Sequence, residues 1–185
     1  MTISSKALRK HIKRRDLVSL RRTTIDDQSI QGFVLDCSKA LILIQYVYDF
    51  HLDGFMVLRR SDITELKTKA TDRFQRQLLL SEGVLDQVEF SFRAPIESFD
   101  SFLASRSSEE IVIVEDEVSE PDRFLIGTVS QIGGGIATIR HFTGVARLVE
   151  PPDDIRTNQI TSCQTRTNYS RFYERHFERI RKMHR

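Results

Sequence analysis

The chain has 185 residues, 39% hydrophobic and 29% charged, which is ordinary for a globular protein of one medium or two small domains. No apolar run approaches the roughly 20 residues that span a bilayer, and the basic start of the chain lacks the apolar core of a secretory signal. We therefore expect a cytoplasmic protein. Cys37 and Cys163 show no metal-ligand spacing and are interpreted as two buried thiols.

The net charge is only +2, but it is distributed unevenly. Residues 1–24 hold eight basic residues and one acidic residue, a net charge of +7, and residues 166–185 hold seven basic and two acidic residues, a net charge of +5. The residues between them therefore carry −10. This asymmetry is typical of a polyanion-binding protein, and it equally fits basic ends that dock on an acidic body of the same protein or of a neighbour.

The first half is predicted to be a short helix followed by strands. Ser4 or Ser5 can cap a helix that ends near Ile12. Apolar segments then predict strands over residues 17–22, 30–36, 41–50, 55–58 and 62–66, of which 41–50 is a long run rich in Ile, Tyr and Val. Gly32, inside the second strand, indicates a sharp bend or a close backbone approach. Asp53-Gly54 predicts the tip of the hairpin that follows the long strand.

The second half repeats this order. A helix is predicted over residues 71–81, an alternating strand over 84–92 and a short helix over 96–104. Further strands are predicted over residues 111–114, 124–131, 136–142, 145–149 and 159–164, with an acidic loop over 115–122 and a final helix over 169–182. Gly133-Gly134-Gly135 is typical of a tight hairpin, since it lacks the Lys-Ser/Thr of a phosphate loop.

The two halves can be aligned with one another. Matching segments are 17–20 with 111–114, 32–34 with 127–129, 42–44 with 137–139, 62–64 with 159–161, and 73–74 with 171–172. The offset rises slowly from 94 to 98, as short loop insertions in a duplicated sequence would produce. The sequence thus predicts a mainly β protein with flanking helices, built of two tandem small β-barrels. Residues 1–83 form the first with its N-terminal helix, and residues 84–185 form the second with its C-terminal helix. One larger α+β domain is the alternative.

The order helix, strand, glycine-bent strand, long strand, hairpin and short closing strand resembles the Sm and Sm-like family, and SH3-type barrels more generally. Gly32 and Gly127 match the bend glycine of that family, and Asp36 falls near its acidic turn. The resemblance covers about residues 5–66 and 98–164. It implies Sm-like barrels, with single-stranded RNA binding and ring-like self-association as the family's properties. The chain also resembles a group of bacterial proteins whose activity is unknown.

The chain departs from the RNA pocket of that family. The family places an Asn just after the turn of the second strand and an Arg-Gly pair near the fourth strand. The corresponding segments here are Lys39-Ala40 and Arg59-Arg60-Ser61 in the first half, and Gly133-Gly134-Gly135 and Arg156-Thr157-Asn158 in the second half. Neither half has the complete motif, so the resemblance supports the fold more than the ligand.

The basic ends carry the functional hypothesis. The candidate nucleic-acid-binding residues are Lys10, Lys13, Arg14, Arg171, Arg175 and Arg179. The last three recur at helical spacing among aromatic residues, a combination that suits single-stranded RNA. An amphipathic helix with solvated arginines, or with an acidic protein partner, is the alternative. We expect a non-enzymatic binding or scaffold protein that forms homo-oligomers through exposed edge strands.

The sequence shows no catalytic constellation, and no cofactor or metal is expected. Asp49, His51 and Asp53 would share one face of a strand and suit a metal ion, but this segment is interpreted as a hairpin tip. A small enzyme with a site near His51 or His141 is the alternative function.

Overall fold

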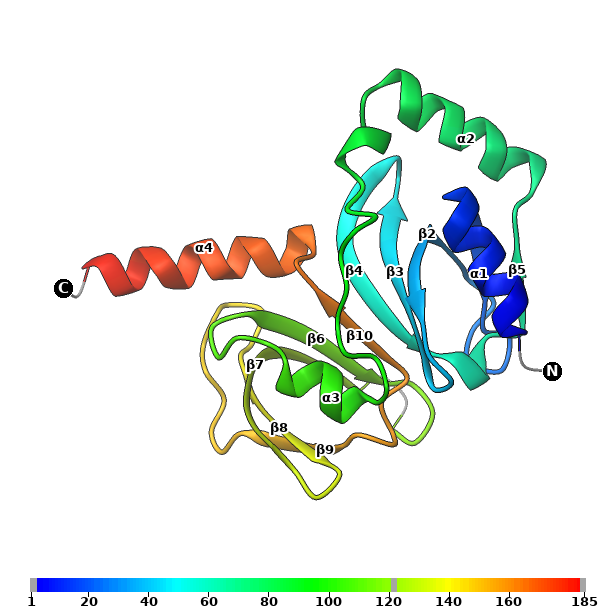
Figure 1. The fold of residues 1–185 in the computed structure, drawn as a ribbon. Coiled ribbons are helices and arrows are strands. Elements are labelled where there is room, and N and C mark those ends of the chain that lie inside the picture. The colour runs from blue at the N-terminus through cyan, green and yellow to red at the C-terminus, as the bar shows by residue number, and fades with distance from the viewer. Residues whose placement is uncertain (1–2, 121–122, 184–185) are drawn as a thin grey trace. The chain divides into compact units, whose positions relative to one another are not determined.

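The computed structural model of the protein describes residues 3–120 and 123–183, so Pro121 and Asp122 of the expected acidic loop lie outside the described residues. The described residues form ten β-strands and four α-helices, which confirms the prediction of a mainly β fold with flanking helices. The chain divides into two compact units, residues 1–98 and residues 99–185 (Figure 1). None of the described helices is long and apolar enough to cross a membrane.

The first unit is a curved antiparallel sheet with a helix on its concave face. Its elements are α1 (Ser5–Arg14), β1 (Leu17–Arg21), β2 (Ser29–Cys37), β3 (Leu41–Tyr48), β4 (His51–Arg59), β5 (Glu65–Lys67) and α2 (Ala70–Ser81). The strands lie in the order β5-β1-β2-β3-β4. Within the described residues β4 and β5 do not pair with each other, so this sheet is open rather than a closed barrel.

Helix α1 is positioned by a cap and by one buried residue. The Ser4 hydroxyl accepts the Ala7 N–H at 3.2 Å, as the sequence predicts, and Arg15 ends the helix at a φ of 52°. Leu8 is fully buried against the sheet. The apolar cluster around it comprises Val18, Leu20, Val34, Ile42, Ile44, Met56, Leu58 and Ile63. Packing of Leu8 into this cluster holds α1 against the sheet.

Residues 84–92 are not a strand, so that prediction is wrong. They contain one short 3-10 turn, Leu85–Gln87, and run across the outer face of the first sheet. The Phe92 ring stacks on Phe55 at 4.0 Å, and the Phe90 ring meets Phe33 edge-on at 5.5 Å. The alternating apolar side chains therefore bury themselves on the face of the sheet instead of pairing along its edge.

Two boundaries in the first unit differ from the prediction. The β3–β4 hairpin turns at Asp49 and Phe50, which have φ values of 45° and 62°, and not at Asp53-Gly54. Gly54, with a φ of 71°, instead lies in a bulge of β4, where its freedom to adopt positive φ is used. The closing strand β5 begins only at Glu65, because Arg60–Asp62 form a 3-10 turn.

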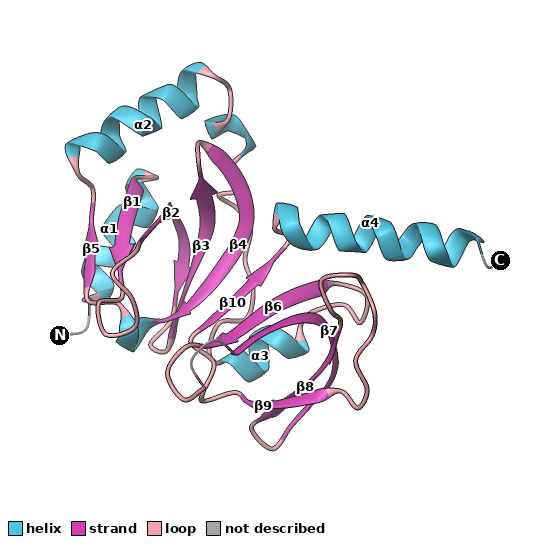
Figure 2. Ribbon diagram, turned by 180° about the vertical axis from the view of Figure 1, so that it is seen from behind, coloured by secondary structure: helices cyan, strands magenta, loops and turns pink. Residues whose placement is uncertain are grey.

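The second unit is also an open antiparallel sheet with a helix against it (Figure 2). Its elements are α3 (Phe99–Ala104), β6 (Ile111–Asp116), β7 (Arg123–Gly133), β8 (Ile136–His141), β9 (Asp153–Arg156), β10 (Ser162–Thr165) and α4 (Asn168–Met183). The strands lie in the order β10-β6-β7-β8-β9. Helix α3 packs on β7 and β8 with Phe99, Phe102 and Leu103 buried.

The returning strand of the second unit was predicted in the wrong place. Residues 145–149 contribute only an isolated bridge between Phe142 and Leu148, and the strand that pairs with β8 is β9. The loop turns at Ala146, which has a φ of 58° and donates its N–H to the Thr143 carbonyl at 2.8 Å. Ile155 of β9 is buried beside Ala137, so one apolar side chain anchors a strand whose other residues are charged. Helix α3 likewise begins at Phe99 and not at residue 96.

The two units repeat one strand order and one register. Gly32 pairs with Val18 and Tyr46, and Gly127 pairs with Val112 and His141, which are the equivalents at offsets of 94 and 95. A bulge follows each glycine, between residues 34 and 36 in β2 and between 129 and 131 in β7. Both units therefore bend their second strand at equivalent positions.

The repetition extends to the end of each unit, where equivalent residues are 97 or 98 positions apart. Thr64 donates its N–H to the Arg21 carbonyl at 2.9 Å and its hydroxyl to the same oxygen at 3.1 Å. Thr161 makes the same two bonds to the Glu115 carbonyl, at 2.9 and 3.1 Å. Helices α2 and α4 then begin at residues 70 and 168, an offset of 98.

Candidate nucleic-acid interface

Helix α4 is held by its inner face. At its start the Thr167 hydroxyl accepts the Ser170 N–H at 3.0 Å, and both residues are buried. Further along, the rings of Tyr173 and Phe177 lie 4.7 and 5.0 Å from the ring of Phe142. These aromatics cover the apolar cluster Ile111, Ile113, Ile126 and Phe142. The helix is thus amphipathic, and its inner face fixes which side chains point into solvent.

The outer face of α4 presents the predicted basic row. Arg171, Arg175 and Arg179 are exposed, recur every four residues and make no ion pair with any described residue. Phe172 is 68% exposed, and the Arg175 guanidinium lies 4.5 Å from its ring centroid. Tyr169 is 48% exposed, and its hydrogen bond to Tyr173 raises the pKa of its phenol, which keeps it neutral. This face therefore combines aromatic rings with cations that have no ion pair among the described residues. We call it the α4 basic face, and it comprises Tyr169, Arg171, Phe172, Arg175 and Arg179.

The basic residues of α1 form a weaker array in the first unit. Lys10, Lys13 and Arg14 lie on one exposed face of the helix. Arg14 lies 3.3 Å from the Asp16 carboxylate, which also accepts a hydrogen bond from His11 at 2.9 Å. Of the three predicted residues on this helix, Arg14 is therefore partly neutralised. The structure brings the three arginines of α4 together on one face, and the three residues of α1 together on another.

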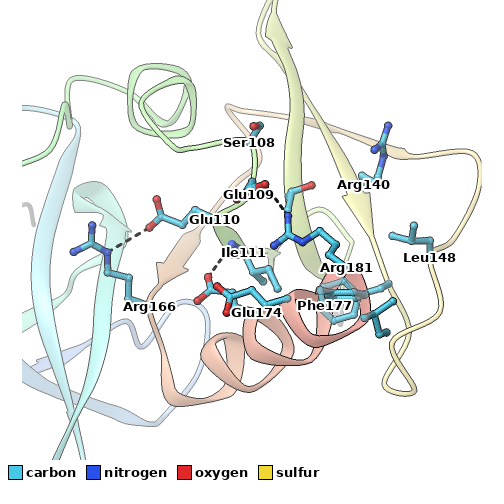
Figure 3. A pocket seen from close by; sticks show the side chains of 14 residues that line it. Ser108, Glu109, Glu110, Ile111, Arg140, Leu148, Arg166, Glu174, Phe177 and Arg181 are labelled. Atoms are coloured by element: carbon cyan, nitrogen blue, oxygen red, sulfur yellow. Dashed lines mark hydrogen bonds and ion pairs between the residues drawn. The ribbon is translucent and has the colours of Figure 1, made fainter. Parts of the chain in front are cut away.

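A pocket of about 560 Å³ lies beside α4 within the second unit (Figure 3). Its apolar lining comprises Ile111, Phe142, Leu148, Phe177 and Ile180. Its charged lining comprises Glu109, Glu110, Glu174 and Glu178 together with Arg140, Arg166 and Arg181. This volume lies in the range of small-ligand pockets, and four carboxylates nearly balance three guanidinium groups.

Some of these charged groups hold one another in place. Arg181 donates to the Glu109 carboxylate at 2.7 Å, and Arg166 lies 3.7 Å from that of Glu110 (Figure 3). Glu174 accepts the Ile111 N–H at 3.1 Å, which ties α4 to the start of β6. The sequence does not predict this pocket. Its only signal was the i, i+4 pair of glutamates at 174 and 178 within a basic helix.

The loops that the Sm resemblance identifies meet in each unit through a backbone hydrogen bond, but the cation of Arg60 in the first unit is not exposed. The Arg60 N–H donates to the Ala40 carbonyl at 2.8 Å, and the equivalent Thr157 N–H donates to Gly135 at 2.9 Å. The Arg60 side chain is buried and donates to the carbonyls of Ile3, at 2.6 and 3.2 Å, and Ser38, at 2.7 Å. Its cation therefore stabilises the fold and is turned away from solvent.

The two histidines of the alternative enzyme hypothesis have sparse surroundings. His51 is exposed, with Nδ1 2.6 Å from the Asp49 carbonyl oxygen. His141 Nδ1 lies 3.2 Å from the Asp153 carboxylate. No group of three or more His, Cys, Asp or Glu that could hold a metal ion occurs among the described residues. Cys163 is fully buried, and its burial raises the pKa of the thiol, so it is a poor nucleophile.

Comparisons with protein-family models, with curated proteins and with solved structures gave no match to this chain.

Proposed function

We propose that the chain is a tandem of two Sm-like β units that binds single-stranded RNA without catalysing a reaction. The duplication is supported by the common strand order, by the bend glycines Gly32 and Gly127, and by the matching registers of the two units. Because Arg60 is buried, the family's usual RNA pocket is not the site that we assign.

The RNA-binding proposal rests on one observation, the exposed arginines and aromatic rings of the α4 basic face. A row of arginines without ion pairs to the described residues, beside an exposed Phe, matches the two needs of a single strand, which are attraction of its phosphates and stacking of its bases. The guanidinium groups attract phosphates, and the rings of Phe172 and Tyr169 offer surfaces on which bases can stack. Lys10 and Lys13 of α1 would add a second, weaker contact.

The binding should depend strongly on salt. Each phosphate neutralised on a single strand contributes about −0.7 to the slope of log K against log salt, so three arginines give a slope of about −2. Fluorescence anisotropy with a labelled mixed-sequence RNA of about ten nucleotides, measured over a range of salt concentrations, reports both the affinity and this slope. Replacing Arg171, Arg175 and Arg179 by Gln should weaken binding and flatten the slope, leaving only the smaller contribution of α1.

A charge-matched control separates the α4 basic face from net charge. Lys39, Lys67 and Arg73 of the first unit are replaced by Gln, which removes the same three charges, and circular dichroism checks that both variants fold. A third variant, with Lys10, Lys13 and Arg14 replaced by Gln, measures the contribution of α1. Equal losses in the α4 variant and the control, or no binding by the parent protein at low salt, would overturn the proposal. An acidic protein partner would then be the better candidate for these arginines.

The proposal includes self-association through strand addition. Strand β5 has one neighbouring strand, β1, and β9 has one, β8, among the described residues, so each leaves one side of its backbone unpaired. Light scattering across a range of protein concentrations tests this: a mass that stays at 21.5 kDa throughout would exclude it. The alternative of a small enzyme near His51 or His141 stays a prediction.

A further inference from the structure

The pocket beside α4 offers hydrogen-bond acceptors on one wall. Glu174 is oriented by the Ile111 N–H, which its Oε1 accepts at 3.1 Å, and it makes no ion pair with a described residue. Glu178 lies one turn further along α4, is exposed and likewise has no ion pair within the part of the chain that the structure describes. One wall of the pocket therefore carries two carboxylates that remain able to accept hydrogen bonds from a ligand.

The rest of the pocket suits a flat ligand that also carries a negative charge. The apolar residues Ile111, Phe142 and Phe177 line it, and Arg140 and Leu148 lie across from Glu174 (Figure 3). Arg140 is exposed and makes no ion pair with a described residue. Because the arginines nearly balance the glutamates, the pocket does not repel a phosphate as a purely acidic site would.

The α4 basic face and the pocket are on adjoining sides of one helix. Arg171 and Glu174 are three residues apart, and so are Arg175 and Glu178, so each pair shares an edge of α4. A strand whose phosphates follow Arg171, Arg175 and Arg179 can therefore turn a nucleotide over that edge toward the carboxylates. A single-stranded base is unpaired, so its Watson–Crick edge is available for such contacts.

We propose that this pocket takes one unstacked base of the strand bound on α4, and that it selects guanine. This inference rests on the proposed RNA-binding function. Guanine offers its N1–H and N2 amino group side by side, and a carboxylate accepts both with its two oxygens. Adenine and cytosine offer one amino group beside a ring acceptor. Uracil offers one N–H between two carbonyl oxygens, which a carboxylate repels.

The test uses a uridine oligomer of about ten nucleotides in which one central position is G, A, C or U, with the full chain and anisotropy detection. The G oligomer should bind about ten-fold more tightly than the all-U oligomer, with A and C between them. Glu174→Gln should abolish this preference, because the amide keeps its acceptor for Ile111 N–H and loses the charge and the second acceptor. Affinity for the all-U oligomer should change little.

Three further measurements keep the outcomes distinct. Glu150→Gln, an exposed charge-matched change in the same unit, should leave the preference intact. Glu178→Gln, at an exposed position on α4, should reduce the preference even if Glu174→Gln fails to fold. The Gln variant at 171, 175 and 179 should weaken the binding of all four oligomers alike and preserve their order of affinity.

Equal binding of the four oligomers by the parent protein would overturn base selection and leave the strand-binding proposal standing. No binding by any oligomer would overturn both.

Discussion

A Cβ atom on Gly127 would lie 2.2 Å from the carbonyl oxygen of Arg140 on the neighbouring strand. Real Cβ contacts do not approach this distance, so β7 and β8 can come together here only because residue 127 has no side chain. Gly32 stands in the same relation to Gln45, at 2.6 Å, in the first unit. In both units the bulge follows two residues later, so the glycine and the bulge together bend the strand.

Gly127→Val should therefore destabilise the protein by about 3 kcal/mol, since the contact is with backbone that cannot rotate away. Gly32→Val should cost a similar amount. Gly133→Val is the matched control, because a Cβ there would have no neighbour within 4 Å. Urea unfolding followed by circular dichroism measures the difference. If Gly127→Val and Gly133→Val unfold at the same urea concentration, the close approach of β7 and β8 is wrong.

The sequence predicts the fold best where apolar residues form a long continuous run or a stripe at helical spacing. Strands β1, β2 and β3 contain continuous buried runs of mostly apolar residues, and α4 has a helical stripe of apolar residues, so these elements lie close to their predicted ranges. Residues 84–92 alternate, but alternation reports only that one side is buried. It does not distinguish a paired strand from an extended segment whose Phe90 and Phe92 lie on a sheet face.

One part of the candidate site could be predicted from the sequence, and the other part could not. Arg171, Arg175 and Arg179 could be placed on one face from their spacing alone, because a helix fixes which residues are neighbours. The pocket beside them could not be predicted. Its lining comes from residues 108–111, from β7 and β8, from Phe142, Leu148 and Arg166, and from α4, and only tertiary packing brings these segments together.

The guanidinium of Arg60 is buried although the residue lies in the 3-10 turn after β4, and it should contribute to the stability of the first unit. Arg60→Met removes three charge-assisted hydrogen bonds and leaves the carbonyls of Ile3 and Ser38 without this donor. We expect a loss of about 2–4 kcal/mol in the free energy of unfolding. Lys39→Met, an exposed change in the facing turn, is the control and should cost little. Indistinguishable urea midpoints for the two variants would contradict the role assigned to Arg60.

The two thiols should differ in reactivity. Burial raises the pKa of both Cys37 and Cys163, but Cys163 is fully buried and Cys37 is only partly so. Since the thiolate is the reactive form, a disulfide reagent should modify Cys37 slowly in the folded protein and faster as the pH rises. Cys163 should react only after unfolding in urea. The variants Cys37→Ser and Cys163→Ser assign each phase, and rapid modification of folded Cys37→Ser would show that Cys163 is accessible.

The segment that joins the two sheets should be held to the first unit by its aromatic residues. Phe92 stacks on Phe55 at 4.0 Å, Phe90 meets Phe33 edge-on, and the Glu89 N–H donates to the Gln45 side chain at 2.7 Å. Phe92→Ala removes the closest of these contacts, which should release residues 84–98 locally before the sheet itself unfolds.

Limited trypsin digestion measures that release, because Arg93 follows Phe92 directly and is exposed. Cleavage after Arg93 should be several-fold faster in Phe92→Ala than in the parent protein, while the thermal midpoint of the sheet falls only modestly. Phe74→Ala on α2 is the control, since Phe74 is 61% exposed and its removal frees no segment. Should trypsin cut Phe92→Ala and Phe74→Ala at the same rate, the stacking on Phe55 would not be what holds this segment in place.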